Sequence, residues 1–401
     1  MNKCYFDHAA TNPLHPEVLD AMMPYFREEF GNALSVYDLG MRARDAIETA
    51  RAQVAALVNA KPGTIVFTSS GVEANNFAVR GAALARKQQG NHIIVSKVEH
   101  HSVLNSARFL EKQGFVVTYL PVDNHGLVDP EVLKKAINKD TILVSITHAS
   151  REIGTLEPIK NLAALAKERG IAFHTDAIAS TGNIPVDVQD LGVDMLSMTG
   201  HQFYGPKGIG ALYIREGTRI VPLIYGGIQE GGRRAGTENV ACIVGMGKAA
   251  QLVHEEMSGR IEHVRRLRDR LVQGIIGMPN VYLTGHPENR LPNHASFVVE
   301  FIEGEAMLLM LAMKGIYTAS GSACSSKALK SSPVLISLGV PTALAQGSIV
   351  FTLGRDNTEE DADYALTEFP KIVARLREMS PFAQKGWDHG ANKGDSCYVG
   401  G

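Results

Sequence analysis

The sequence predicts an α/β protein with a large, mainly parallel, seven-stranded sheet domain and a second, smaller α+β domain. Two observations lead to this prediction. Short β-rich segments alternate with helix-period segments from residue 15 to about 215, and a long helical stretch and a shorter mixed region follow. Strands that alternate with helices form mainly parallel sheets covered on both faces. At roughly 150 residues per domain, the 401 residues suffice for two or three domains.

The strands of the large domain are predicted where β-rich runs lie between polar turns. Apolar residues at helical spacing, such as Ile47, Ala50 and Val54, mark the segments between strands. Ligands of such sheets bind at the carboxyl ends of the strands, so we expect the functional site there. The predicted strands are 64–68, 92–96, 116–121, 141–147, 172–175, 194–198 and 210–214.

The smaller domain is predicted from the pattern that follows a glycine-rich stretch at 226–234. A long helix over 241–276 leads into it, and the chain ends in a glycine-rich tail that we expect to be weakly structured. The predicted strands of this part are 295–301 and 348–353, and its predicted helices are 306–313 and 361–379. The expected division is a large domain over 15–255, a small domain formed by 1–14 and 256–379, and a flexible tail over 380–401.

The composition excludes several classes of function. The 40 Lys and Arg residues balance 42 Asp and Glu residues, so no global field favours nucleic acid or anionic lipid. No apolar run approaches the roughly 18 residues of a membrane span, and the N-terminus lacks the apolar core of a signal peptide. We therefore expect a cytoplasmic protein. No metal site or disulfide framework is predicted from the spacing of the four cysteines, which are Cys4, Cys242, Cys324 and Cys397.

Polar segments at predicted strand ends could carry chemistry. The turn at 69–76 opens a helix whose first amides could bind a phosphate, although such a turn is often only a turn. Asp176 could hold a protonated ring nitrogen of a cofactor, or it could simply cap a turn. Thr199 and His201 either line the same crevice or pack within a loop.

Cys324 lies in the small, polar segment 319–326, which is typical of an exposed thiol whose thiolate can attack or carry a ligand. A buried cysteine would normally have bulky apolar neighbours. The sequence therefore favours a reactive Cys324, whereas Cys4, Cys242 and Cys397 are interpreted as inert.

Taken together, these segments resemble the NifS/IscS-type cysteine desulfurases, which are fold-type I pyridoxal phosphate (PLP) enzymes of the class V aminotransferase group. The match runs from residue 5 to residue 381. It implies the PLP-dependent transferase fold and sulfur transfer for iron–sulfur cluster assembly or thiolation. The segments that carry the resemblance are 5–11, 31–36, 73–76, 98–100, 152–155, 174–177, 204–208, 234–240, 321–326 and 353–355.

In that family cysteine reacts on PLP, a lysine moves protons, and a loop cysteine takes the sulfur as a persulfide while alanine leaves. The resemblance implies that His100 stacks on the pyridine ring and assists proton transfer, and that Asp176 pairs with the ring nitrogen. The implied phosphate contacts are Gly71, Val72, Thr199, His201 and, from the partner subunit of a homodimer, Thr237.

The resemblance also implies partners. Cys324 would carry the persulfide to an iron–sulfur scaffold protein or another sulfur acceptor. Asn32 and Arg151 are the expected contacts to the substrate, which is L-cysteine or another sulfur donor.

The position of the family's Schiff-base lysine holds Gln202, whose amide cannot form an imine or shuttle a proton. Lys207, five positions on, lies in a turn shared with the family and is interpreted as structural rather than as a substitute. Other departures remove a phosphate hydroxyl, a ring-hydroxyl contact, an Asn-Asn pair and the arginine that clamps the substrate carboxylate. The residues at these positions are Val72, Ala179, Ser150 with Arg151, and Val350.

These departures leave three hypotheses. The first is a sulfur-transfer protein that uses Cys324, with ordinary PLP and lysine chemistry impaired and PLP not covalently bound, if it binds at all. The second is an inactive paralogue that acts as a scaffold or regulator. The third is an enzyme in which Arg151 binds a different anionic substrate, although Arg151 could equally form a local ion pair in vacated cofactor space.

Overall fold

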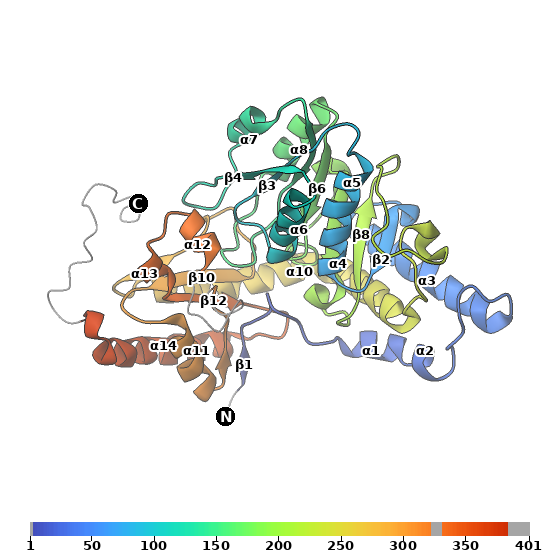
Figure 1. Ribbon diagram of the computed structural model, residues 1–401. Coiled ribbons are helices and arrows are strands. Elements are labelled where there is room, and N and C mark those ends of the chain that lie inside the picture. Colours follow the sequence, from blue (N-terminus) through green and yellow to red (C-terminus); the bar gives the residue numbers. More distant parts are fainter. Residues whose placement is uncertain (1–2, 322–330, 384–401) are drawn as a thin grey trace. The chain divides into compact units, whose positions relative to one another are not determined.

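The computed structural model describes residues 3–321 and 331–383, which group by contact into a large and a small unit (Figure 1). The large unit comprises Ala9–Arg151 and Thr155–Ile261, and the small unit comprises Met1–His8, Glu152–Gly154 and Glu262–Gly401. This grouping puts residues 9–14 and 256–261 in the large unit, whereas the sequence-based division assigns them to the small domain. The division into domains stays a prediction. Most of the expected tail, residues 384–401, lies outside the described residues.

The large unit is built on a seven-stranded sheet with the order β2-β8-β7-β6-β5-β3-β4. Only β8 runs antiparallel to its neighbours, β2 and β7; the other pairs are parallel. This arrangement confirms the predicted mainly parallel α/β fold. The strands are β2 (Ile65–Thr68), β3 (His92–Ser96), β4 (Val116–Leu120), β5 (Thr141–Ser145), β6 (Ala172–Asp176), β7 (Met195–Thr199) and β8 (Gly210–Ile214).

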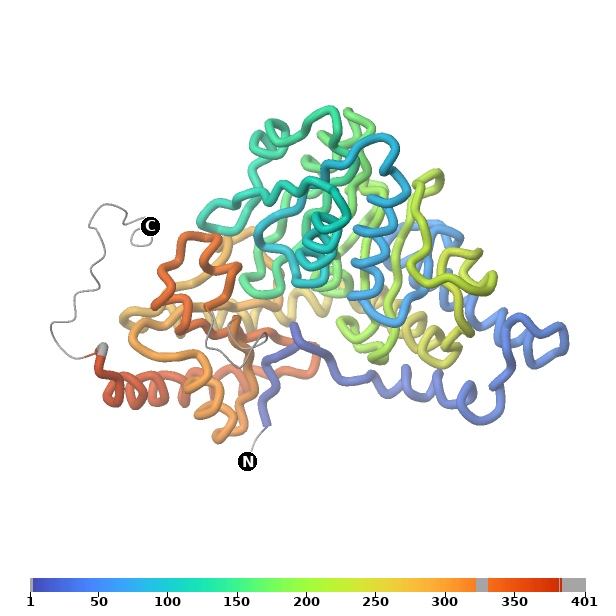
Figure 2. Tube along the Cα trace, viewed as in Figure 1, coloured from blue at the N-terminus to red at the C-terminus, as the bar shows by residue number. Residues whose placement is uncertain are grey.

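Alternate strand residues point to opposite faces of this sheet. Helices cover both faces, and the path of the chain between them can be followed in Figure 2. Phe67 packs into the core on one face, whereas its neighbour Val66 packs into the core on the other. The first face is covered by α1 (Pro16–Met22), α3 (Asp38–Leu57), α7 (Pro130–Ala136), α8 (Ile159–Glu168), α9 (Val188–Leu191) and the start of α10 (Val240–Ile276). The second face is covered by α4 (Gly71–Asn76), the π-helical segment Phe77–Gly81, α5 (Ala82–Ala85) and α6 (His101–Glu111).

The small unit has its own core between short sheets and helices. Its antiparallel sheet has the order β12-β10-β9, and β1 pairs in parallel with β11. Its strands are β1 (Cys4–Tyr5), β9 (Val281–Leu283), β10 (His294–Val299), β11 (Ile316–Tyr317) and β12 (Ser348–Thr352). Its helices after α10 are α11 (Gly304–Met313), α12 (Pro333–Ser337), α13 (Thr342–Ala345) and α14 (Glu359–Met379).

Three further features bear on the predictions. Burial, followed by the hydrogen bond to Asp361, raises the pKa of Cys4 to about 12, which fits the inert thiol expected there. Among the described residues, no helix has both the length and the apolar character needed to cross a membrane. The carboxyl ends of β2, β3, β6 and β7 lead directly into the segments that hold most of the predicted site residues.

Candidate functional site

Asp176 is the last residue of β6 and lies buried at the carboxyl edge of the sheet. Its two carboxylate oxygens both accept hydrogen bonds: Oδ2 from the side-chain amide of Asn75 at 2.6 Å, and Oδ1 from the backbone N–H of Ile178 at 3.0 Å. Burial raises the pKa of Asp176, while these two hydrogen bonds and the charge of Arg151 act in the opposite direction. The carboxylate is therefore fixed in orientation, as a group that pairs with a ring N–H must be.

His100 is the residue that caps the N-terminus of α6. Its ring Nδ1 accepts the backbone N–H of Ser102 at 3.2 Å and lies 2.7 Å from the Ser102 hydroxyl oxygen. Burial, followed by the positive charges of Arg151 and His101, lowers the pKa of His100 to about 4. The imidazole is consequently neutral at pH 7 and can exchange a proton through its other nitrogen.

Thr199 ends β7, and His201 follows in the turn Gly200–Phe203. The Thr199 hydroxyl donates to the backbone oxygen of Ile209 at 3.0 Å and lies 3.1 Å from Nδ1 of His201. Because the hydroxyl has only one hydrogen, Nδ1–H of His201 is the donor in the second contact. Burial, followed by the charges of Lys207 and Arg151, lowers the pKa of His201.

Gly71 begins α4 at a point of close approach. A Cβ atom on this residue would lie 2.3 Å from Cδ1 of Ile178 and 3.3 Å from Cβ of Thr199. The start of the helix therefore packs directly against the segments that follow β6 and β7. The next residue, Val72, is 50% exposed and has no hydroxyl to offer an anion.

Gln202 is buried, and its side chain is engaged with the N-terminal segment of the large unit. Its Nε2 donates to the backbone oxygens of Ala9 at 2.9 Å and Ala10 at 3.4 Å. In return, the side-chain amide of Asn12 donates to the backbone oxygen of Gln202 at 2.8 Å. These bonds hold residues 9–12 against the turn after β7, and the carboxamide that makes them is not a nucleophile.

Arg151 is exposed. Its positive charge helps to lower the pKa values of His100 and His201, and it opposes the rise in the pKa of Asp176. The guanidinium therefore belongs to the same cluster. Ser150, the residue before it, is buried.

Other predicted residues lie elsewhere. Asn32 is exposed, and its side-chain oxygen accepts the backbone N–H of Leu34 at 2.9 Å. Thr237 is exposed in the loop before α10. Val350 is buried within β12 of the small unit, and Cys324 lies outside the described residues.

Sequence reasoning did not single out Asn75, Ser102 or Glu99 as members of the site. The carboxyl of Glu99 accepts the Ser96 hydroxyl at 2.6 Å and the backbone N–H of Thr147 at 2.8 Å, and burial raises its pKa to about 8. Asn75 was visible as part of a motif, but its partner Asp176 lies 101 positions away. Ser102, two residues after His100, could have been noticed as a local hydroxyl partner.

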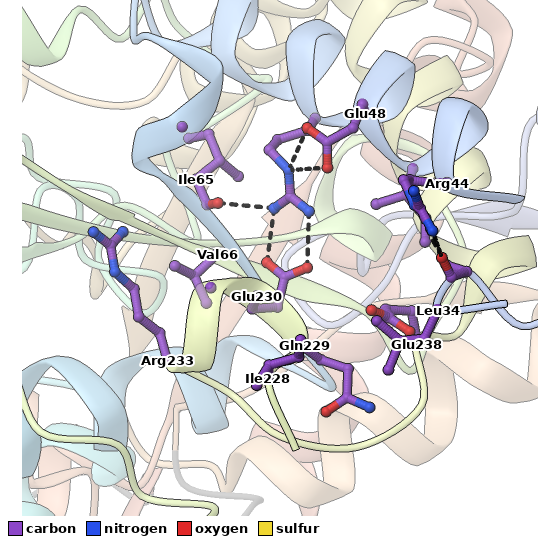
Figure 3. Close-up of a pocket in the computed structure, with 15 residues that line it drawn as sticks. Leu34, Arg44, Glu48, Ile65, Val66, Ile228, Gln229, Glu230, Arg233 and Glu238 are labelled. Atoms are coloured by element: carbon purple, nitrogen blue, oxygen red, sulfur yellow. Dashed lines mark hydrogen bonds and ion pairs between the residues drawn. The ribbon is translucent and has the colours of Figure 1, made fainter. Parts of the chain in front are cut away.

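The glycine-rich stretch before Thr237 is fixed by a buried ion pair. Arg51 and Glu230 form two hydrogen bonds, of 2.7 and 2.8 Å, and the Glu230 carboxylate also accepts the backbone N–H of Phe67 at 2.7 Å. Both residues of the pair line a cavity of about 420 Å³, in which Figure 3 labels Glu230. Further along, Arg234 donates to Glu73 of α4 at 2.9 Å. The loop that carries Thr237 is thus tied both to β2 and to α4.

Comparisons with known proteins agree with this geometry. The family model for aminotransferase class-V matches residues 4–365. The chain is 53% identical over 382 residues to a cysteine desulfurase IscS of Dictyoglomus turgidum, covering 95% of this chain and 97% of that protein. It is 50% identical over 381 residues to a cysteine desulfurase IscS of Methanosarcina thermophila, covering 95% of this chain and 94% of the relative.

Solved structures of similar fold lead to the same family. A NifS-like protein superposes with a TM-score of 0.88 at 36% identity, covering 94% of this chain and all of that one. The apo structure of a cysteine desulfurase from Thermococcus onnurineus NA1 gives 0.83 at 28% identity, covering 93% and 95% of the two chains. The chain therefore belongs to the aminotransferase class-V family and, within it, to the cysteine desulfurases of the IscS/NifS type.

Proposed function

We propose that this protein transfers sulfur for iron–sulfur cluster assembly or thiolation, with Cys324 as the persulfide carrier, and that Gln202 impairs ordinary lysine-dependent chemistry. One observation supports the proposed impairment by Gln202. The residue at the position of the family's lysine is a buried amide whose hydrogens are committed to the backbone oxygens of Ala9 and Ala10. The sulfur-carrying role of Cys324 is supported by membership of the family.

The donor set fits the pyridine ring of PLP but not its covalent attachment. Asp176 offers an oriented, buried carboxylate, and His100 offers a neutral ring beside it. Gly71, Thr199 and His201 converge at the start of α4, where the phosphate would be held. When bound, PLP supplies an electron sink for bond cleavage in an amino acid. We propose that it binds without a covalent link, more weakly than in relatives that keep the lysine.

The remaining residues limit the reaction that the site can perform. A positioned proton shuttle contributes about 10²- to 10⁴-fold to a rate, and the Gln202 amide cannot take that role. His100 is neutral at pH 7, but its Nδ1 already faces the hydroxyl and the backbone N–H of Ser102, and a pKa of about 4 makes the ring a weak base. Desulfuration of cysteine is therefore expected to be slow.

The substrate's carboxylate presents a second problem, because valine at position 350 cannot make the charge-assisted pair that an arginine would. Arg151 is the cation whose charge acts on His100, His201 and Asp176 together, whereas Lys207 acts on His201. We propose that Arg151 contacts the anionic sulfur donor; a contact from Asn32 stays a prediction from the family resemblance. L-cysteine is the first donor to test.

A homodimer is part of the proposal. Four apolar side chains on two segments of the large unit are strongly exposed: Phe30 (70%), Val36 (88%), Tyr225 (77%) and Ile228 (76%). Leu34 and Ile228 of these two segments line the same cavity, and exposed apolar groups on neighbouring segments are typical of a covered interface. We propose that a second copy of the chain covers them, and that the exposed Thr237 reaches the phosphate site of that copy. A cytoplasmic location likewise stays a prediction.

The experiment that tests the function is the intact mass of reductant-free protein after incubation with L-cysteine, with and without PLP. The proposal predicts one added sulfur atom that is lost on reduction, that needs PLP, and that is absent from Cys324→Ser. An unchanged mass with cysteine, followed by sulfur uptake from a pre-formed persulfide donor, would keep the carrier and exclude cysteine as its source. Equal sulfur uptake by Cys324→Ser would contradict the carrier role.

The commitment of Gln202 to the backbone also favours a second candidate, a scaffold or regulator without catalysis. That candidate predicts a stable complex with a sulfur-acceptor protein that survives Cys324→Ser. Pull-down of the purified acceptor by both forms distinguishes the two functions, because loss of the complex in the variant contradicts a purely structural role.

A further inference from the structure

Asn75 joins two parts of the site that the sequence keeps far apart. Its side chain is fully buried, and its Nδ2 lies 2.6 Å from Oδ2 of Asp176 and 2.9 Å from the hydroxyl oxygen of Ser102. The Ser102 oxygen lies in turn 2.7 Å from Nδ1 of His100. A continuous chain of hydrogen bonds therefore runs from the carboxylate at the end of β6 to the imidazole at the start of α6.

The orientation of the Asn75 amide follows from its neighbours. Asn75 Oδ1 has no hydrogen-bond partner among the described residues, although it is buried. The opposite orientation of the amide, with Oδ1 and Nδ2 exchanged, is unfavourable. It would put Oδ1 2.6 Å from a carboxylate oxygen of Asp176, and the two oxygens would repel each other. Both hydrogens of Nδ2 are thus used as donors, one to Asp176 and one to Ser102.

The backbone N–H of Ser102, which donates to Nδ1 of His100, determines the direction of the remaining bond. The Ser102 oxygen accepts from Asn75, and its single hydrogen is left for Nδ1 of His100. The backbone N–H of Ser102 points at the same nitrogen, at 3.2 Å. Two donors that converge on Nδ1 leave no room for a proton there, so the neutral ring carries its hydrogen on Nε2.

We propose that Asn75 is a positioning residue that, through Ser102, couples the carboxylate of Asp176 to the tautomer of His100 and holds the Nε2–H form. Without Asn75, no donor holds the other side of the Ser102 hydroxyl, so its hydrogen can turn away from Nδ1, which then keeps only the longer backbone contact and can take up the proton. The inference rests on the proposed function, since His100 and Asp176 matter here as members of the sulfur-transfer site. Its test uses the protein without PLP or cysteine, so failure of sulfur transfer would not be confused with failure of the inference.

The test is a long-range ¹H–¹⁵N correlation spectrum of the histidine rings in the full chain at neutral pH, with His100 assigned through His100→Gln. The native protein should show His100 as a single Nε2–H tautomer. Asn75→Leu, which is similar in size but has no donors, should show a shift of the Nδ1 signal toward that of a protonated nitrogen. The matched control is Asn76→Leu, because the Asn76 amide donates only to Val72 of its own helix in the described contacts and its loss should leave His100 unchanged.

Ser102→Ala provides a second variant should the buried Asn75→Leu fail to fold. It removes the bridging hydroxyl and leaves Nδ1 only the longer backbone contact, so it should also populate the second tautomer. Native protein with the proton on Nδ1 would overturn the proposal at once. So would folded Asn75→Leu or Ser102→Ala protein, judged by circular dichroism, with native His100 ring-nitrogen signals.

Discussion

The side-chain amide of Gln202 donates a hydrogen bond of 2.9 Å to the backbone oxygen of Ala9. This bond gives Gln202 a structural role, because it fastens residues 9–12 of the large unit to the turn that follows β7. Replacement of the amide therefore tests two properties separately: whether the rest of the cofactor site is intact, and how much the fastening stabilises the fold.

Gln202→Lys should restore covalent binding of PLP, because the residues proposed to hold its ring nitrogen and its phosphate, Asp176, Thr199 and His201, are present. The measurement is the intact mass after incubation with PLP and borohydride reduction, which should show one added pyridoxyl phosphate group at position 202. Gln202→Met, which has similar length but no amine, is the matched control and should show none. Absence of the adduct in folded Gln202→Lys protein would mean that the proposed contacts to the ring and phosphate of PLP, and not only the lysine, have been lost.

The fold was predictable where the signal is local. Strands β3 and β8 were predicted with the observed bounds, 92–96 and 210–214, since each is a short β-rich run between turns. Strands β1 and β9 were not predicted, because two or three residues carry no detectable periodicity. The helix that begins at Gly71 was predicted, but the π-helical segment Phe77–Gly81 within its continuation was not.

The candidate site was predictable only as separate groups. Asp176, His100 and Thr199 were recognised from their motifs. The residues that each one contacts depend on the sheet, which brings Asn75 to Asp176 across 101 positions of the sequence. The partner of Gln202 was equally hidden, because Ala9 belongs to a segment that the sequence analysis assigned to the small domain. Physical contacts between remote segments are a property of the topology, which local spacing does not encode.

Gly71→Ala should destabilise the protein although alanine is the better helix former. The new methyl group would lie 2.3 Å from Cδ1 of Ile178, and overpacking of this kind costs about 1–3 kcal/mol, more than the roughly 0.5–1 kcal/mol gained from helix propensity. Urea unfolding should show that Ile178→Ala suppresses this cost in the double variant. Strictly additive effects of the two substitutions would contradict the contact.

Glu230→Gln should destabilise the protein strongly, because it removes the buried one of the two carboxylates that face the Arg51 guanidinium; the other, Glu48, is 58% exposed. The side chains of Arg51 and Glu230 are only 9% and 3% exposed, and breaking a buried pair costs about 3–5 kcal/mol. The matched control is Glu216→Gln, whose partner Lys61 is exposed, so that its effect should stay below about 1 kcal/mol. Chemical denaturation measures both, and equal effects would contradict the buried pair's contribution.

The pH dependence of stability should reflect buried groups of opposite kinds. Burial lowers the pKa of His100 and His148 to about 4 and of His174 to about 3. Below pH 6.5 these three histidines therefore bind more protons in the unfolded state than in the folded state. These histidines therefore contribute stability that is lost as the pH falls from 6.5 toward 4. Burial also raises the pKa of Glu99 and Glu157 to about 8, so each carboxyl contributes stability that is lost as the pH rises from 4.5 toward 8.

The alkaline side of this profile isolates the two carboxyls, because above pH 6.5 the histidines are neutral in both the folded and the unfolded state. Between pH 6.5 and 8 the free energy of unfolding should fall by up to about 1.4 kcal/mol per pH unit for each buried carboxyl.

Glu99→Gln with Glu157→Gln keeps the size of both side chains and removes their protons, so the double variant should lose most of this decline. Urea unfolding from pH 6.5 to 8 provides the measurement. A native profile that rises over that range, or a double variant with the native slope, would mean that these carboxyls are ionised in the folded protein. Their buried oxygens would then need a cation or further donors that the described contacts of Glu99 and Glu157 do not include.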